Sequence, residues 1–252
     1  MEDQKKIPQL KTDTDLALIY AGCRKPFPDG LVHKIRELED LMNSQITPAF
    51  WWTLCDLSFE EDGIRLGDTD IVLRGELAKK QLSGSEQAVF MAGTLSVSFD
   101  RALQRIQIQS PADALLFDAL GSSAIESVID LAEDEIRKTM PDYEIGQRFS
   151  CGYGDLPLEL QKDLFETFQL SRRCGIYLTD SLMMNPTKSI TAFAPLKKRA
   201  KKDPRKDDIE TEKKSHLKNC EECSMKDTCG FSRQSNQEQS GYRSAADPEN
   251  GI

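Results

Sequence analysis

The sequence predicts an α+β fold, formed by one domain over residues 14–196. Two apolar runs of strand length, 47–59 and 87–95, lie among segments with helical periodicity, of which 110–140 is the longest. Strands and helices do not alternate regularly, so a parallel βαβ arrangement is not indicated. Hydrophobic residues make up 38% of the chain and charged residues 30%, which is typical of a globular protein with polar extensions.

The first half of the domain contains a helix followed by strands. An amphipathic helix over 31–42 is predicted by apolar residues that recur at helical spacing: Leu31, Ile35, Leu38, Leu41 and Met42. The aromatic-rich segment 47–59, TPAFWWTLCDLSF, indicates a strand. After a turn at Asp62-Gly63, residues 64–73 predict a second strand that leads into a short helix near 75–82.

The second half centres on one long helix. Residues 87–95 predict a buried strand, and 97–109 predict a helix. Ser110 is a good N-cap, Pro111 suits the first helical turn, and the helix is expected to run to about Met140. The remaining elements are expected downstream of Pro141: a helix over 158–169 and strands over 174–179 and 189–196.

The ends of the chain differ in composition from the domain. Residues 1–13 are expected to be a flexible polar arm. Residues 197–218 are rich in Lys and Arg and almost free of apolar side chains, which predicts a disordered basic linker. A cysteine cluster follows over 219–233, and the polar residues 234–252 are expected to be a disordered tail.

Net charge and apolar runs restrict the class of protein. The net charge is −9, and an acidic body argues against a nucleic-acid partner. No run approaches the roughly 18 apolar residues that span a bilayer, and the first ten residues lack the apolar core of a signal peptide. Seven cysteines at irregular spacing fit reduced thiols or a metal site, so a cytoplasmic location is expected.

The segment RFSCGYGDLP, from Arg148 to Pro157, has the residue types of a site for a small charged ligand. Gly152 and Gly154 flank Tyr153, so the backbone can adopt positive φ and its amides could bind a carboxylate together with Arg148. The ring of Tyr153 can face a cation, a sulfonium or an adenine. The alternative is a tight turn in which Asp155 caps the next helix and Arg148 pairs with a surface acid.

The same segment, with GIYLTDSLMMNPTKSITAF downstream, resembles the S-adenosylmethionine-binding activation domain of cobalamin-dependent methionine synthase. The segments MAGTLSVSFDRALQRI and DALGSSAIESVIDLAEDEI resemble the preceding strand and long helix of that domain. The resemblance covers roughly residues 30–196 and implies a bent antiparallel sheet flanked by helices. By position it implies that S-adenosylmethionine is bound by Arg148, Gly152, Tyr153 and Glu126.

The resemblance also implies a role in reactivation. A standalone domain of this kind would be an accessory component of a methyltransferase, not a complete enzyme. It would present S-adenosylmethionine to the inactive cob(II)alamin of a partner methionine synthase, with an electron from a flavodoxin or ferredoxin-type donor. Two departures from the family stand out: Cys151 replaces a common proline, and a ligand-contacting segment that follows Phe193 in the full-length enzymes is replaced by the basic linker.

The cysteines Cys220, Cys223 and Cys229 have a C-x2-C-x5-C arrangement. A C-x2-C pair can place two thiolates on one metal ion, and the third cysteine would provide a third ligand. With His216 as the fourth ligand the site would suit zinc, and with three cysteines alone it would suit an iron–sulfur cluster. The alternative is a tail with reduced thiols.

Two other functions remain compatible with the sequence. One keeps the fold but activates a different corrinoid protein. The other is a metal-knuckle interaction module, in which the basic linker and the cysteines act and the α+β domain is a scaffold.

Overall fold

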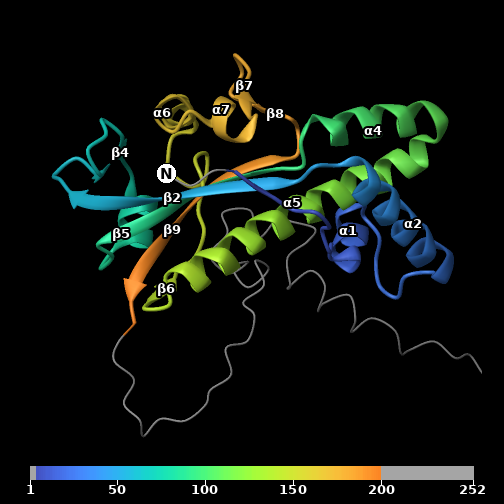
Figure 1. Cartoon of the computed structure of the whole chain (residues 1–252), viewed down its shortest axis with the longest axis horizontal. Coiled ribbons are helices and arrows are strands. Elements are labelled where there is room, and N and C mark those ends of the chain that lie inside the picture. Colours follow the sequence, from blue (N-terminus) through green and yellow to red (C-terminus); the bar gives the residue numbers. More distant parts are fainter. Residues whose placement is uncertain (1–3, 200–252) are drawn as a thin grey trace, which may run out of the picture. The chain divides into compact units, whose positions relative to one another are not determined.

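The computed structural model describes residues 4–199, which lie in one compact unit (Figure 1). Its sheet has the order β4-β3-β2-β5-β9-β6, with β1 paired to β2, and every neighbouring pair of strands is antiparallel. The strands are β1 (Lys5–Lys6), β2 (Ala49–Phe59), β3 (Ile64–Leu66), β4 (Val72–Leu73), β5 (Gln87–Thr94), β6 (Tyr143–Ile145) and β9 (Ser189–Lys198). A separate hairpin is formed by β7 (Tyr177–Leu178) and β8 (Met184–Asn185).

The helices divide between the two faces of the sheet. They are α1 (Thr14–Tyr20), α2 (Asp29–Gln45), α3 (Glu76–Leu82), α4 (Val97–Gln109), α5 (Pro111–Thr139), α6 (Gln161–Thr167) and α7 (Leu170–Cys174), with a 3-10 turn at Leu158–Leu160. In Figure 1, α5 runs along one side of the central strands, and α6 and α7 lie on the other side. The predicted α+β class and antiparallel sheet are therefore confirmed.

Alternation along the central strands builds two hydrophobic cores, because successive side chains of a strand point to opposite faces. The first core lies under α1, α2, α4 and α5, and Trp52 of β2 belongs to it. The second core lies under α3, α6 and α7, and Trp51 of β2 belongs to that one. In β5, Met91 lies in the first core and Phe90 in the second. Both faces are covered, which explains why residues 87–95 read as an unbroken apolar run.

The long helix α5 packs along the first core. Ser110 caps it as predicted, accepting a hydrogen bond from the Asp113 amide at 3.2 Å, and Pro111 lies in its first turn. Gly121 lies where α5 meets α4, and a Cβ atom there would run into the ring of Phe99. That ring stacks on Phe117 with centroids 5.0 Å apart. The helix therefore approaches α4 closely at a point where the sequence supplies glycine.

Several predicted boundaries change. Residues 4–13 are not a free arm, because Lys5–Lys6 pair with β2 and Leu10 is buried in the first core. The strand expected over 64–73 is interrupted by a turn and gives β3 and β4. At the other end, Lys197 and Lys198 belong to β9, where they pair with β6, so the sheet extends into the expected linker.

The segment around 158–179 also differs from its prediction. The single helix expected over 158–169 is a 3-10 turn followed by α6 and α7, because Gln169 adopts a left-handed conformation between the two helices. Cys174 ends α7, so the strand expected over 174–179 shrinks to β7. Helix α1 and strands β6 and β8 were not expected, since each is short and has little periodicity. Within residues 4–199, no helix has both the length and the apolar character needed to cross a membrane.

Candidate functional site

Arg148 is positioned by the pairing of its neighbour with the sheet. Phe149 donates its amide to the Phe193 carbonyl at 2.9 Å and accepts the Phe193 amide at 2.8 Å. Its ring enters the second core, 5.7 Å from the ring of Phe193. Because adjacent side chains of an extended chain point in opposite directions, Arg148 faces the side of the sheet on which α5 lies.

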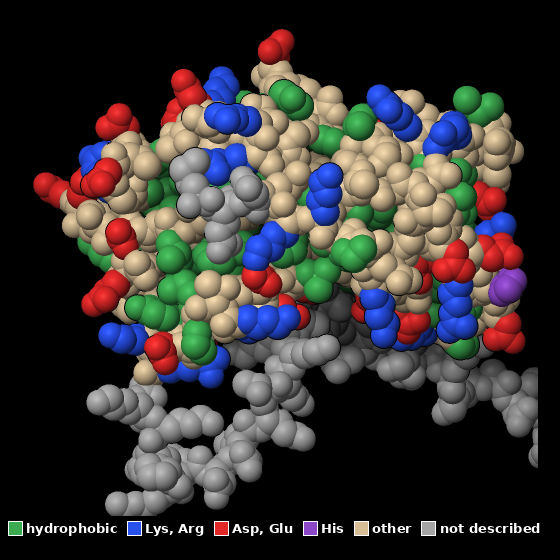
Figure 2. Space-filling view, viewed as in Figure 1, with side chains coloured by type: hydrophobic (Ala, Val, Ile, Leu, Met, Phe, Trp, Pro, Cys, Tyr) green, Lys and Arg blue, Asp and Glu red, His purple; other side chains and the backbone are tan. Residues whose placement is uncertain are grey.

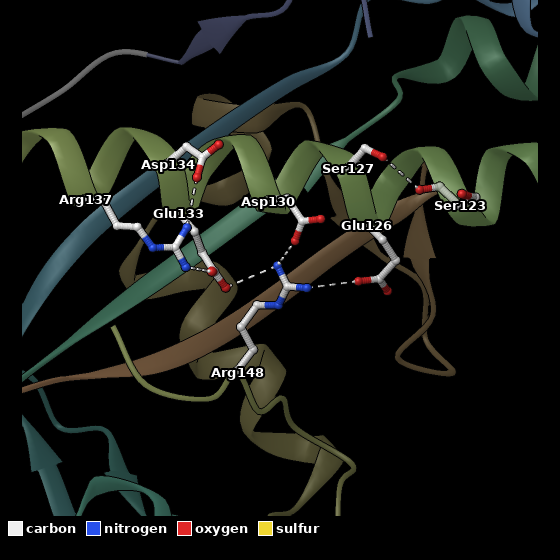
Figure 3. A network of polar contacts seen from close by, with 8 residues as sticks. All are labelled: Ser123, Glu126, Ser127, Asp130, Glu133, Asp134, Arg137 and Arg148. Atoms are coloured by element: carbon white, nitrogen blue, oxygen red, sulfur yellow. Dashed lines mark hydrogen bonds and ion pairs between the residues drawn. The ribbon is translucent and has the colours of Figure 1, made fainter. Parts of the chain in front are cut away.

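Three carboxylates of α5 surround the guanidinium of Arg148 (Figure 3). Its Nη1 atom lies 2.8 Å from Asp130 and 3.2 Å from Glu133, and its Nη2 atom lies 3.4 Å from Glu126. These acids are three or four residues apart, so they share one helix face. The structure therefore brings together Arg148 and Glu126, two of the residues predicted for the site. The Nε edge of the guanidinium takes part in none of these contacts.

The electrostatics of the cluster are unbalanced toward negative charge. Burial opposes the charge of Arg148, but Glu133, Asp130 and Glu126 outweigh it and raise the arginine pKa above its usual value. The pKa of Glu133 is also raised, because burial and the charge of Asp130 exceed the attraction of Arg148 and Arg137. The two directions would conflict in an isolated ion pair. Here both raised pKa values are consistent. Three carboxylates together raise the pKa of Arg148, and Glu133 is the most buried of the three, so burial raises its own pKa.

The turn after Arg148 is closed by its own backbone. The amide of Gly152 donates to the Leu156 carbonyl at 2.9 Å, and that of Tyr153 donates to the Ser150 carbonyl at 3.2 Å. Gly152 has a φ of 86°, and an added Cβ atom would also lie 3.3 Å from Leu158. These two amides are used to form the turn, so neither is available to bind a ligand carboxylate. Gly152 instead lets the turn present Tyr153, a residue that is 66% exposed.

Asp155 caps a helix, but not the one that follows it. Its carboxylate accepts hydrogen bonds from the amides of Glu76 at 2.6 Å and Leu77 at 3.0 Å, at the start of α3. The neighbouring Gly75 has a φ of 111°, and a Cβ atom there would touch the Asp155 carboxyl group. Asp155 thus links the turn that contains Gly152 and Gly154, here called the glycine turn, to a helix almost eighty residues earlier in the chain.

Replacing Asp155 with asparagine is expected to destabilise the fold at neutral pH, because the amides of α3 lower the pKa of this carboxyl group. The contribution is present above the unfolded-state value of about 4 and is lost as the pH falls through the lower folded-state pKa. Urea unfolding should show a gap between wild type and Asp155→Asn that is constant from pH 7 to 5 and narrows below about pH 4. Asp180→Asn, at an exposed acid of the β7–β8 connection, serves as the control. A gap unchanged in acid would contradict the capping role.

Two residues outside the predicted set, Tyr20 and Ser123, lie beside the predicted ones. Burial raises the pKa of Tyr20 to about 12, with further contributions from Glu126, Tyr153 and Asp13. These electrostatic contributions show that the end of α1 lies near α5 and near the glycine turn. Ser123 of α5 donates to the Asp13 carbonyl at 2.8 Å and fixes the start of α1 there. In the sequence, Asp13 before Thr14 was a detectable N-cap signal.

Cys151, which stands in place of the common proline, is a buried thiol. Burial raises the pKa of Cys151, Cys174 and Cys55 to about 12 in each case. Thiolate is therefore scarce at pH 8, and we expect iodoacetamide to leave these three cysteines unmodified in the native protein and to alkylate them in urea. Peptide mass spectrometry after each treatment checks this. Native labelling of Cys151 would show that the turn opens.

The metal site expected at Cys220, Cys223 and Cys229 lies outside the described residues. Among residues 4–199, no group of three or more His, Cys, Asp or Glu side chains is arranged to hold a metal ion.

The fold and this site define an α+β domain in which one arginine lies between an acidic helix face and a glycine turn. Residues 125–202 match the family described as vitamin B12 dependent methionine synthase, activation domain. The fold is similar to that of a crystal structure of the MetH reactivation domain bound to AdoHcy, with a TM-score of 0.61 and 14% sequence identity over 79% of this chain and 80% of that chain. No curated protein matches the sequence. The motif that predicted this family thus lies within a segment that matches its model, and residues beyond that segment share the fold of the reactivation domain.

Proposed function

We propose that this protein binds S-adenosylmethionine beside Arg148 and supports the reductive methylation of cobalamin on a partner methionine synthase. The observation that carries the proposal is the convergence of Glu126 of α5 with Arg148 and Tyr153 of the segment 148–157. The match of residues 125–202 to the activation domain and the shared fold support it. AdoHcy, which is bound in the similar structure, is the product left when S-adenosylmethionine gives up its methyl group.

The charges at Arg148 suit the zwitterionic end of this ligand. An α-carboxylate can be bound by the Nε edge of the guanidinium, which the α5 acids leave untouched. The α-ammonium can be bound by Glu126, whose contact with Arg148 is the longest of the three at 3.4 Å. A ligand can therefore displace this pair at small cost while Asp130 and Glu133 hold the arginine in place.

The sulfonium is favoured by its surroundings. The acids around Arg148 exceed its charge, so the site attracts a cation. The exposed ring of Tyr153 can lie against the sulfonium or against the adenine. Burial raises the pKa of Tyr20 to about 12, so this side chain stays neutral at physiological pH and adds no charge to the site. Gly152 shapes the turn that carries Tyr153.

The protein would contribute binding and orientation to the reaction. One electron and the methyl group of S-adenosylmethionine convert cob(II)alamin to methylcobalamin and leave S-adenosylhomocysteine, so the atoms and charges balance. We propose that the electron comes from a flavodoxin or ferredoxin-type protein and that the cobalamin belongs to the partner. Methyl transfer then requires the sulfonium to be held toward the partner with the carboxylate anchored at Arg148. The cytoplasm is the compartment in which we expect the partners to meet.

Isothermal titration calorimetry tests the binding step. The full-length chain titrated with S-adenosylmethionine should give a saturable 1:1 isotherm, with weaker binding of S-adenosylhomocysteine because that ligand lacks the sulfonium charge. Glu126→Gln should weaken binding of both ligands, since both carry the α-ammonium group. Glu37→Gln, at an exposed acid of α2, is the matched control. Absence of binding to the wild-type protein would overturn the ligand assignment.

We further propose that Cys220, Cys223 and Cys229 hold a metal, either zinc or an iron–sulfur cluster. An anaerobic ultraviolet–visible spectrum and metal analysis of the purified chain test this, since an iron–sulfur cluster absorbs near ~400 nm and zinc does not. Loss of the metal in Cys223→Ser is expected. Protein free of both metals after anaerobic purification would contradict the proposal.

A further inference from the structure

A cavity lies on the face of the sheet opposite to α5, between α7, the β7–β8 hairpin and the first turn of α4. Figure 1 shows the end of β8 close to the start of α4, with α7 beside them. The cavity has a volume of about 600 Å³, within the usual range for sites that bind small molecules. It shares no residue with the site around Arg148.

The cavity is positively charged, although the protein as a whole is acidic. Lys6, Arg172 and Arg173 line it, and no Asp or Glu is among the described residues that do so. In Figure 2 the central part of the visible face carries Lys and Arg side chains, while Asp and Glu side chains gather mainly toward its two ends. Within residues 4–199, neither Arg172 nor Lys6 forms an ion pair, so their charges are left for a ligand.

Arg173 is held by an aromatic ring and not by an acid. Its guanidinium carbon lies 4.9 Å from the centre of the Trp51 ring, a cation–π arrangement. Its Nε atom is buried and has no hydrogen-bond partner within the described chain. A buried donor without an acceptor costs free energy, and natural structures seldom leave one without a reason. The side chain is thus fixed at the cavity, while no acid among residues 4–199 forms an ion pair with it.

The amino end of α4 adds backbone donors to the same cavity. Ser96 and Val97 line it, and the Ser96 side chain makes no capping hydrogen bond to the helix. The hydroxyl of Ser96 instead contacts the hydroxyls of Ser98 at 2.6 Å and Thr47 at 3.2 Å. The first amides of this thirteen-residue helix therefore have no side-chain cap, which favours an anion. Asp100, the acid of this turn, is engaged by Thr187.

The rim supplies an aromatic surface. Tyr177 of the hairpin, a residue that is 57% exposed, lines the cavity, and Val97 lines the same space. A planar ring can stack on Tyr177, while two adjacent arginines suit the geometry of a phosphate. We propose that this cavity binds a phosphate ester of nucleotide size, with the phosphate at Arg172, Arg173 and the start of α4, and the organic group at Tyr177.

Titration of the full-length chain with ADP, inorganic phosphate and adenosine tests the proposal. ADP should bind at least tenfold more tightly than inorganic phosphate or adenosine, because ADP alone carries both a phosphate and a planar ring. Arg172→Glu should weaken ADP binding by at least tenfold, and Lys6→Glu, at an exposed position, should act in the same direction. Arg24→Glu, at an exposed arginine outside the cavity, should leave it unchanged. Thermal unfolding without ligand shows whether each variant is folded.

The remaining outcomes separate this cavity from the Arg148 site and from other ligands. Arg172→Glu should retain S-adenosylmethionine binding, and Arg148→Ala should retain ADP binding. ADP binding that is lost in Arg148→Ala would overturn the proposal, as would equal binding of ADP and phosphate, which would indicate an adventitious ion only. Binding of heparin without ADP would indicate a surface for an acidic macromolecule and would also overturn it.

Discussion

Replacing Arg148 with alanine is expected to weaken S-adenosylmethionine binding by about 100-fold. A bidentate, charge-assisted pair contributes about 3 kcal/mol at most, and 1.4 kcal/mol corresponds to a factor of ten in affinity. The substitution also leaves Glu133 and Asp130 without their central cation, so the loss includes the cost of a site that repels the ligand carboxylate. Calorimetry of the folded variant measures the change.

Two further variants separate charge from geometry at this position. Arg148→Lys keeps the positive charge but not the planar fork, so it should recover only part of the affinity. Arg137→Ala removes the other arginine of the cluster, which pairs with Glu133 at 2.5 Å and Asp134 at 3.0 Å. Its effect should stay below about threefold, because exposed pairs contribute under about 1 kcal/mol. Equal losses in Arg137→Ala and Arg148→Ala would mean that only the net charge of the cluster matters.

Replacing Gly121 with alanine is expected to destabilise the fold by about 1–3 kcal/mol, the usual cost of overfilling a packed core. In an exposed helix the same change would stabilise by about 1 kcal/mol, so the sign is informative. At Gly121 the added methyl group would collide with the ring of Phe99, and the stacked Phe117 blocks the movement of that ring. Chemical denaturation measures the free energy of unfolding.

A matched control and a rescue test the same contact. Gly30→Ala in α2 adds a methyl group where no atom lies within 4 Å, and we expect it to be neutral or stabilising. In a Phe99→Leu background, Gly121→Ala should cost less than in the wild type, because the smaller side chain leaves room. Additive effects in the double variant would show that the two residues do not meet.

The residue pattern predicted the elements that bury a continuous face. Residues 87–95 and the Ser110-Pro111 helix start came out as expected, because apolar runs and caps are local signals. Helix α1 and strand β6 were missed, since each is short and is held by contacts with distant parts of the chain. Lys5 and Lys6 were predicted to belong to a polar arm, but their backbone pairs with β2 at an edge of the sheet. Side-chain polarity alone does not predict this backbone pairing.

Part of the candidate site could be proposed from the sequence, because several of its residues are neighbours along the chain. Arg148, Gly152 and Tyr153 lie in one motif, and the resemblance assigned them together. Tyr20 comes from α1 and reaches the site only through the packing of α1 against α5. The partner of Asp155 was also out of reach of a local reading, because the helix that it caps begins at Glu76. Contacts between residues so far apart in the sequence produce no local residue pattern from which they could be predicted.

Transfer of a labelled methyl group tests the proposed reactivation function most directly. The full-length chain is mixed with a cob(II)alamin-bound methionine synthase that lacks its own activation domain, a one-electron reductant and S-adenosylmethionine carrying a labelled methyl. We expect label on the partner's cobalamin with the wild-type chain and little with Arg148→Ala, while Arg172→Glu remains active. Equal methylation in the presence and absence of the chain would contradict it.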